Sequence, residues 1–266
     1  MTIKKKKYFT VREIDGRMGI QSPHEGELKT IEKGFINFFM KYPKKSIKDI
    51  VEKKLNGNFE ALGFDEDYAI TLEYFPGVNI HVLYNNYEDD EDEAFSGAEL
   101  RFLFSGERVT WVPSEDLLSL LESTFDYLEE QVEGINTIYK LPNSKSDLLV
   151  MSIEQRKVPF KHLKIEDLNS LASFVGGIGG LLHDKWTLSK NFFPGIEVTL
   201  IYDIKKEEID FSYHGQNLDH INNYAKDQFA IFLMNHCLRF ISSTYNIKEP
   251  GIIKKIFSFN YQKSQF

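Results

Sequence analysis

The sequence has little cysteine, no long apolar run and no excess of basic residues. Its one cysteine, Cys237, cannot form a disulfide within the chain, which fits a reducing compartment. No stretch approaches the roughly 18 consecutive apolar residues of a membrane span. The N-terminal residues 1–15 are basic but lack the apolar region of a secretory signal. These absences predict a cytoplasmic protein with no membrane partner.

The negative charge is concentrated in one short segment. The chain has a formal net charge of −8, and six of these charges come from the acidic run Glu88, Asp89, Asp90, Glu91, Asp92 and Glu93. The remaining residues carry only −2 and form no dominant basic face. Because phosphate neutralisation supplies most of the affinity for nucleic acids, we do not expect a nucleic-acid partner.

Motifs of catalysis and metal binding are also missing from the sequence. The seven histidines form no HExxH motif and have no zinc-site spacing with Cys237, and no GxSxG motif occurs. His236 and Cys237 are adjacent on a predicted helix, where neighbouring side chains do not face each other. The sequence therefore predicts no catalytic residues, no metal site and no cofactor.

The chain does contain one long internal repeat. Residues 68–84 and 186–202 match at a spacing of 118, with Phe75-Pro76-Gly77 recurring as Phe193-Pro194-Gly195. Four of the 17 positions are identical and eight more are conservative. This period is far longer than the roughly 20–50 residues of a solenoid repeat, so it predicts a duplicated half-domain.

Each copy follows the same order of apolar patterns. Residues 78–84 and 196–202 alternate apolar and polar side chains, as strands with one buried face do. Shorter strands are expected at 67–74 and 185–192, joined to them by Pro-Gly turns that favour a bulged or slightly splayed hairpin. Third strands are expected at 99–104 and 208–213, followed by a short fourth strand and an amphipathic helix.

These patterns predict an α+β fold of two pseudo-symmetric β-β-β-β-α copies with antiparallel sheets and flanking helices. We place the first copy at residues 1–134 and the second at 135–266, packed as one unit, because no Pro-, Gly- or Ser-rich linker separates them. Helices are expected at 27–41, 46–56 and 165–182. Further strands are expected at 8–14, 135–141, 147–153 and 251–261.

A buried aromatic core is expected to hold each copy together. In the first copy it comprises Phe102, Trp111, Leu121 and Phe125, and in the second Phe211, Phe232 and Phe240. Ser114 is expected to be the N-cap of the helix that follows Pro113, with two acidic residues in its first turn.

Three other features have more than one interpretation. The acidic run is an insertion relative to the second copy, so it is either a solvated loop, a docking epitope for a basic partner or a cation site; its spacing does not match a calcium loop. The glycines within 176–180 follow a predicted helix, whereas a phosphate loop precedes one. This order favours helix-end packing, and the alternative is a close backbone approach to a partner or ligand. His81 is expected on the outward face of its strand.

The Phe-Pro-Gly turn and the acidic stretch ending at Phe95 resemble bacterial proteins for which the resemblance implies no activity. The sequence thus favours a non-enzymatic binding or regulatory protein, of which an inhibitor or immunity-type protein is one form. Its acidic run would engage a basic protein surface. The alternative is an enzyme or small-ligand binder with its site in the cleft between the two copies. No residue pattern indicates an oligomeric state.

Overall fold

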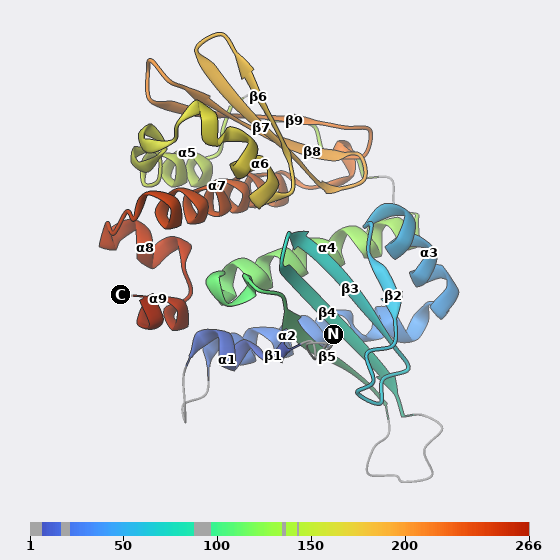
Figure 1. The fold of residues 1–266 in the computed structure, drawn as a ribbon. Coiled ribbons are helices and arrows are strands. Elements are labelled where there is room, and N and C mark those ends of the chain that lie inside the picture. The colour runs from blue at the N-terminus through green and yellow to red at the C-terminus, as the bar shows by residue number, and fades with distance from the viewer. Residues whose placement is uncertain (1–6, 17–21, 88–96, 135–136, 143, 266) are drawn as a thin grey trace, which may run out of the picture. The chain divides into compact units, whose positions relative to one another are not determined.

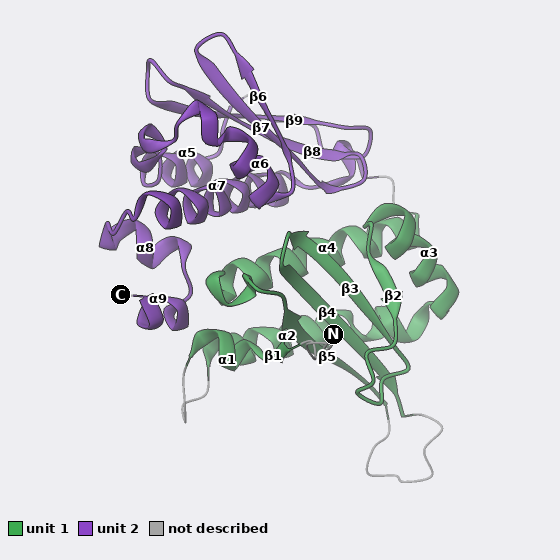
Figure 2. Ribbon diagram, viewed as in Figure 1, with its two compact units in different colours: residues 1–135 green, residues 136–266 purple. Residues whose placement is uncertain are grey.

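The computed structural model describes residues 7–16, 22–87, 97–134, 137–142 and 144–265 (Figure 1). The chain divides into two compact units, Met1–Ile135 and Asn136–Phe266 (Figure 2). Each unit has its own antiparallel sheet with helices beside it. The fold class is therefore α+β with two antiparallel sheets, as the sequence predicts.

The first unit is built on a five-stranded sheet in the order β1-β5-β4-β3-β2. Helix α4 packs on one face of it, where the hydroxyl of Tyr74 donates to the carbonyl of Leu120 at 3.4 Å. The elements of this unit are β1 (Tyr8–Phe9), α1 (Val11–Asp15), α2 (Pro23–Lys41), α3 (Lys44–Lys54), β2 (Asn58–Glu60), β3 (Tyr68–Phe75), β4 (Val78–Asn86), β5 (Ala98–Ser105), the 3-10 helix η2 (Val109–Trp111) and α4 (Ser114–Glu133).

The second unit is built on a four-stranded sheet in the order β6-β7-β8-β9. Helix α7 packs on it, and the rings of Phe192 and Phe229 stack with centroids 4.6 Å apart. The elements are α5 (Asp147–Glu154), η3 (Val158–His162), η4 (Ile165–Asp167), α6 (Leu168–Val175), β6 (Ile178–Leu182), β7 (Lys185–Phe193), β8 (Ile196–Asp203), β9 (Glu208–His214), η5 (Leu218–His220), α7 (Asn223–Tyr245), α8 (Pro250–Ile256) and α9 (Phe259–Gln265).

The two Phe-Pro-Gly turns have the same local geometry. Gly77 and Gly195 both have φ of +76°, and both hairpins carry the predicted register shift just before the turn. A Cβ at Gly106 would lie 2.1 Å from the Gly77 carbonyl oxygen, and one at Gly215 would lie 2.2 Å from that of Gly195. Only glycine, which has no Cβ, allows the backbone to pass so close to these carbonyl oxygens. That the two halves arose by duplication remains a prediction.

The predicted fourth strand after each hairpin is wrong. Residues Val109–Trp111 and Leu218–His220 form 3-10 helices instead. The reason is local: the N–H groups of Arg108 and Asn217 donate to the carbonyls of Gly77 and Gly195, both at 3.0 Å. These bonds turn the chain out of the sheet. The fourth strand of the second sheet, β6, and its counterpart β2 come before the hairpin rather than after it.

Three other predicted strands are largely helical, because side-chain caps start two of the helices and a proline at the first helical position favours the third. Only Tyr8–Phe9 of the segment 8–14 is a strand, because Thr10 and Glu13 form a capping box that starts α1. Residues 147–153 lie in α5, where the side chain of Ser146 accepts the N–H of Leu149. The segment 251–261 forms α8 and α9, with Pro250 in the first turn of α8.

Two further segments differ from the predicted boundaries. The helix expected at 165–182 ends at Val175, and residues Ile178–Leu182 are the strand β6. The strand expected at 135–141 is absent from the described residues 137–141. The helices expected at 27–41 and 46–56 are confirmed as α2 and α3.

The predicted core is confirmed at four of its seven residues. Leu121, Phe125, Phe232 and Phe240 are buried. Phe102, Trp111 and Phe211 are only half-buried. Phe102 and Phe211 lie on β5 and β9, near the outer edge of each sheet, where a neighbouring strand covers one side only. Among the helices in the described ranges, none combines the length and the apolar composition needed to cross a bilayer.

Phe125 is a direct test of the core of the first unit. Its ring contacts those of Phe35, Phe39 and Phe102, with centroid separations of 4.9, 5.4 and 6.2 Å. We expect Phe125→Ala to lower the free energy of unfolding by roughly 3–5 kcal/mol. Chemical denaturation measures this loss, and a value below about 1 kcal/mol would remove Phe125 from the core.

Candidate functional site

The acidic run Glu88–Glu93 lies outside the described residues, so its predicted partner-binding role stays a prediction. The residues that flank it are placed. The N–H of Tyr87 donates to the carbonyl of Gly97 at 2.7 Å, which closes the connection between β4 and β5. Tyr87 and Gly97 therefore lie together at one end of the first sheet. Elsewhere in the described residues, no three acidic, histidine or cysteine side chains are arranged to hold a metal ion.

Strand β5 has an incompletely paired edge. On its outer side, β1 pairs only with Phe104 and Ser105. The N–H of Leu100 also points outward, since it donates to Oε1 of Glu32 on α2 at 3.4 Å. Alternate residues of a strand direct their main-chain groups to the same side, so the N–H and C=O groups of Phe102 point outward as well. In the described part of the chain, no strand pairs with the outer side of Leu100 and Phe102.

A hollow of about 430 Å³ lies along this edge, between β5 and α2. Helix α2 contributes one face to it, because residues three or four apart in a helix are neighbours. The lining combines apolar and charged side chains: Thr10, Val11, Glu25, Leu28, Lys29, Glu32, Leu100, Arg101, Phe102 and Leu103. We call this hollow and the adjoining edge of β5 the β5 groove.

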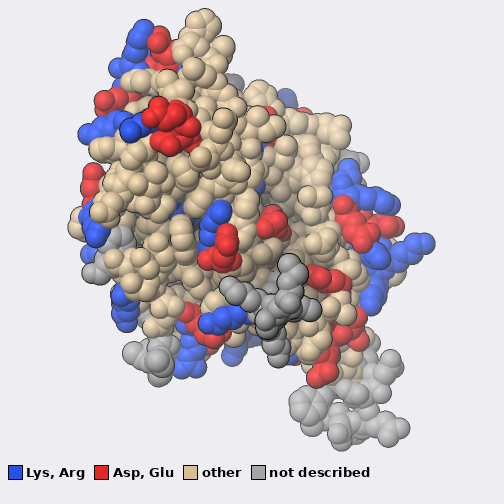
Figure 3. Space-filling view, viewed as in Figure 1, with Lys and Arg blue, Asp and Glu red and all other residues tan. Residues whose placement is uncertain are grey.

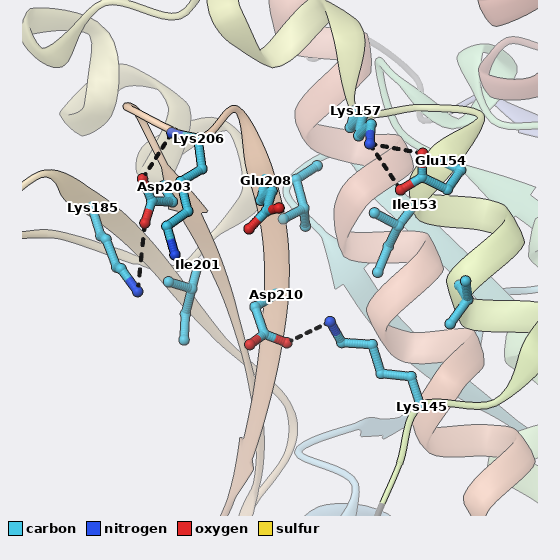
Figure 4. A pocket seen from close by; sticks show the side chains of 12 residues that line it. Lys145, Ile153, Glu154, Lys157, Lys185, Ile201, Asp203, Lys206, Glu208 and Asp210 are labelled. Carbon is cyan, nitrogen blue, oxygen red and sulfur yellow. Dashed lines mark hydrogen bonds and ion pairs between the residues drawn. The ribbon is translucent and has the colours of Figure 1, made fainter.

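A second hollow, of about 440 Å³, lies beside β9, one of the two outer strands of the second sheet (Figure 4). Its wall is strongly charged, with four lysines and four acidic residues: Lys145, Lys157, Lys185, Lys206, Glu154, Asp203, Glu208 and Asp210. Three of the lysines pair with acids in this wall, at distances between 2.7 and 3.7 Å. The outer side of β9 therefore faces an almost self-neutralising set of charges.

One ion pair stands directly at the β9 edge. Oδ1 of Asp210 lies 2.8 Å from Nζ of Lys145 and accepts the N–H of Phe211 at 2.8 Å. Burial alone raises the pKa of Asp210, but the bonds from Lys145 and Phe211 outweigh it and hold the pKa below its ordinary value. Asp210 therefore stays charged at neutral pH. Charged side chains on outer strands are a common protection against pairing with another chain.

The open edges of β5 and β9 thus differ in protection. On β9 a charged pair occupies the edge. On the part of β5 that β1 leaves open, the described residues place the Glu32 carboxylate at the N–H of Leu100, at the longer distance of 3.4 Å. The guanidinium of Arg101 is bound to the Phe64 carbonyl at 2.7 Å and to Asn85 at 3.3 Å. On the face of the molecule shown in Figure 3, acidic and basic side chains lie intermixed.

His81 lies on the face of β4 that the strand parity predicts, but that face is covered and His81 is fully buried. The segment between β2 and β3 crosses it: Asn85 donates to the Asp65 carbonyl at 2.6 Å, and the ring of Phe64 packs edge-on against Tyr8. Tyr8 in turn contacts the ring of His81, with centroids 5.1 Å apart.

His81 is part of a chain of hydrogen bonds. Its Nε2 lies 2.7 Å from the hydroxyl of Ser105, its Nδ1 lies 2.7 Å from the hydroxyl of Thr71, and Thr71 donates to Glu60 at 2.5 Å. The order of groups is that of a serine nucleophile and its base. However, Ser105 and His81 have no exposed surface for a substrate to reach. We interpret the chain as a structural network that satisfies buried polar groups.

A second polar cluster joins three helices of the first unit. Asp15, at the end of α1, accepts hydrogen bonds from Ser22 and from His24, whose Nδ1 lies 2.9 Å away. Ser114, in the first turn of α4, donates to Asp15 at 2.5 Å. The prediction that Ser114 is an N-cap is therefore wrong: Pro113 holds that position, and the Ser114 hydroxyl serves Asp15 instead.

The remaining candidates have structural roles. Gly176 ends α6 with φ of +67°, and the N–H of Gly177 returns to the Ala172 carbonyl at 2.9 Å, so the predicted helix-end packing is confirmed for these two glycines. Gly179 and Gly180, for which it was also predicted, lie in strand β6 instead. Cys237 is fully buried in α7, and burial raises the pKa of its thiol. A protonated, inaccessible thiol is not a nucleophile. The sequence signals for these roles were the glycines that follow an apolar helical pattern and the position of Cys237 on a predicted helix.

Asp15 makes stability depend on pH in a defined direction. Burial alone raises its pKa, but the hydrogen bonds from Ser114, Ser22 and His24 outweigh that effect and lower the pKa. A lowered folded-state pKa stabilises the fold above the unfolded value of about 3.9, and this contribution is lost as the pH falls through the folded value. We expect Asp15→Asn to cost roughly 2–3 kcal/mol at neutral pH.

Urea denaturation of the wild type and of Asp15→Asn, measured between neutral pH and about pH 2, tests this assignment. The difference in unfolding free energy should shrink as the pH falls below about 4. A difference that stays constant over the whole range would show that Asp15 contributes through packing and not through its charge.

Comparison of the chain with protein-family models, with curated proteins and with solved structures finds no match.

Proposed function

We propose that the chain is a non-enzymatic binding protein that engages an extended segment of another protein at the β5 groove. The observation that carries this proposal is the outward-facing main chain of Leu100 and Phe102, which lies beside a hollow of about 430 Å³. An added strand would pair with these groups and place alternate side chains in the hollow. Strand addition of this kind gives affinity through the main chain and specificity through the pocket.

The existing partner of β5 supports this mode of binding. Tyr8 and Phe9 already pair antiparallel with Ser105 and Phe104, so the edge accepts a strand in its present geometry. After Phe9 the chain leaves the edge to form α1. An incoming segment would continue the line of β1 along the rest of β5, between that strand and α2. It would replace the Glu32 carboxylate at the N–H of Leu100.

The second sheet provides an internal comparison. Its outer strand β9 also borders a hollow, yet there the ion pair of Lys145 and Asp210 occupies the edge. An incoming strand would have to remove a charged acceptor from the N–H of Phe211 and separate that pair. Binding therefore costs more at β9 than at β5. We propose β5 as the edge that takes the partner.

The partner we propose is a protein with a basic surface. The acidic run Glu88–Glu93 precedes β5 in the sequence and is separated from its first residue, Ala98, by residues 94–97. Six negative charges there would speed association with a positively charged partner. An inhibitor or immunity-type protein that blocks a basic enzyme is one form of this function.

We also propose a cytoplasmic location, which the single, buried cysteine supports. The alternative function, an enzyme or small-ligand binder with its site in the cleft between the two copies, remains a prediction from the sequence.

A substitution in the groove tests the binding site. Leu28 lies on α2 and lines the groove, whereas Met40 lies on the same helix outside it and is 41% exposed. The probe is a short synthetic peptide selected from a random-peptide display library on the wild-type protein. We expect Leu28→Lys to weaken its binding by about 10–100-fold, because burial of a leucine contributes roughly 1.5–3 kcal/mol.

Met40→Lys adds the same charge to the same helix and should leave the affinity unchanged. Fluorescence anisotropy measures both affinities, and unfolding curves verify that both variants fold. Equal losses in the two variants, or no loss in Leu28→Lys, would place the peptide elsewhere and contradict the proposed groove.

The acidic run has a separate test. Replacing Glu88–Glu93 with a Gly/Ser connection should leave stability unchanged or slightly improved, since six like charges repel one another. It should slow association with a basic partner, by an amount that shrinks as salt screens the charges. Stopped-flow association at several salt concentrations measures this effect. Association that is unchanged and insensitive to salt would exclude the run from partner binding.

A further inference from the structure

Strand β6 presents an unusually apolar edge. It is the outer strand of the second sheet on the side opposite β9, and its sequence Ile-Gly-Gly-Leu-Leu contains no charged residue. The side chains of Ile178, Leu181 and Leu182 are 72%, 52% and 60% exposed. A flat, uncharged, apolar outer strand is a template for pairing with another strand.

The other outer strands of the two sheets are shorter or charged. Strand β1 has two residues, and β2 has three, of which Asn58 and Glu60 are exposed. Strand β9 is protected by the pair of Lys145 and Asp210. Strand β6 is longer than β1 and β2 and carries no charged residue. Among the described outer strands, its edge is therefore the least protected against pairing with another strand.

The glycines of β6 have packing reasons that leave the outer edge free. A Cβ at Gly179 would lie 2.9 Å from the side chain of Leu168 on α6, and one at Gly180 would lie 2.9 Å from the hydroxyl of Thr187 on β7. Both contacts are with this unit's own elements. They hold β6 against α6 and β7, and the exposed side chains are not needed for that packing.

We propose that β6 is a self-pairing edge, on which the β6 strand of a second copy of this chain pairs antiparallel about Gly180. A twofold antiparallel pair must place one residue opposite its own equivalent, and Gly180 is the middle residue of β6. This register pairs all five residues of the strand. The proposal is independent of the partner proposed for β5.

Self-complementarity is the reason to name a second copy as the occupant. In this register Ile178 lies opposite Leu182 of the second copy, and Leu181 lies opposite Gly179. Each exposed apolar side chain therefore meets an apolar side chain or a glycine. Beyond the strand, His183 at the turn falls opposite Gly177, which has no side chain to collide with it. No like charges are brought together within the pair.

The size of the contact limits its strength. A pair of five-residue strands buries less than the roughly 1,200–2,000 Å² of a stable interface. We therefore expect a weak dimer, with a dissociation constant on the order of micromolar to millimolar, that forms at high concentration and dissociates on dilution.

Cysteine cross-linking tests the register. Residues opposite each other in an antiparallel pair have Cα atoms about 4.5–5.5 Å apart, which suits a disulfide. The variant carrying both Ile178→Cys and Leu182→Cys should form a covalent dimer on oxidation. Each single variant should stay monomeric on a non-reducing gel, because its cysteine faces a residue without a thiol. The native Cys237 is buried and serves as the background control in the wild type.

Sedimentation velocity over about a hundredfold range of concentration tests the self-association itself. We expect a concentration-dependent dimer that Leu181→Lys abolishes. Ile138→Lys, which places the same charge at a 68% exposed isoleucine outside any strand, should leave it intact. A wild type that stays monomeric at all concentrations, a dimer that survives Leu181→Lys, or cross-linking of the single-cysteine variants would each overturn the proposal.

Discussion

Unpaired main-chain groups at the outer strands of the two sheets are the constraint on which this account depends. An antiparallel sheet leaves N–H and C=O groups along two outer strands without a neighbour, and these must be met by water, a side chain or another chain. In the described residues, Glu32 meets the N–H of Leu100, and Asp210, which pairs with Lys145, meets the N–H of Phe211. The edges differ in how well they are protected against strand pairing, and these differences indicate where a strand of another chain can pair.

The groove beside β5 depends in turn on where α2 is held. Asp15 fixes the start of α2 through Ser22 and His24, and it fixes the start of α4 through Ser114. Because α2 forms one wall of the groove, the buried carboxylate that stabilises the first unit also positions the candidate binding surface. Stability and binding are therefore linked through one residue that lies outside the groove itself.

Much of the fold could be predicted from periodicity and turn chemistry. The alternation in 78–84 and 196–202 and the Pro-Gly turns indicated both hairpins, and the apolar stripes indicated α4 and α7. The errors occurred where a short segment had apolar residues without a clear period. At 147–153 the N-cap at Ser146 starts a helix. At 109–111 the hydrogen bond from the N–H of Arg108 to the Gly77 carbonyl turns the chain out of the sheet. The periodicity of apolar residues carries no information on such hydrogen bonds.

The candidate site was harder to predict from the sequence than the fold. His81 was assigned to the correct face of its strand, but only the crossing segment near Asp65 shows that this face is covered. The β5 groove joins residues of β5, α2 and the start of α1, which are distant in sequence and carry no motif. An edge can be recognised only once the strand order is known. The acidic run, by contrast, was evident from composition alone.

Amide hydrogen exchange along β5 tests the central claim most directly. It is measured by NMR on the full chain, free and saturated with a peptide selected on the wild-type protein. The account predicts that exchange at the amides of Leu100 and Phe102 slows strongly on binding, while the inward-facing amides of Arg101 and Leu103, already paired with β4, change little. Unchanged exchange at Leu100 and Phe102 in the saturated protein would contradict strand addition at this edge.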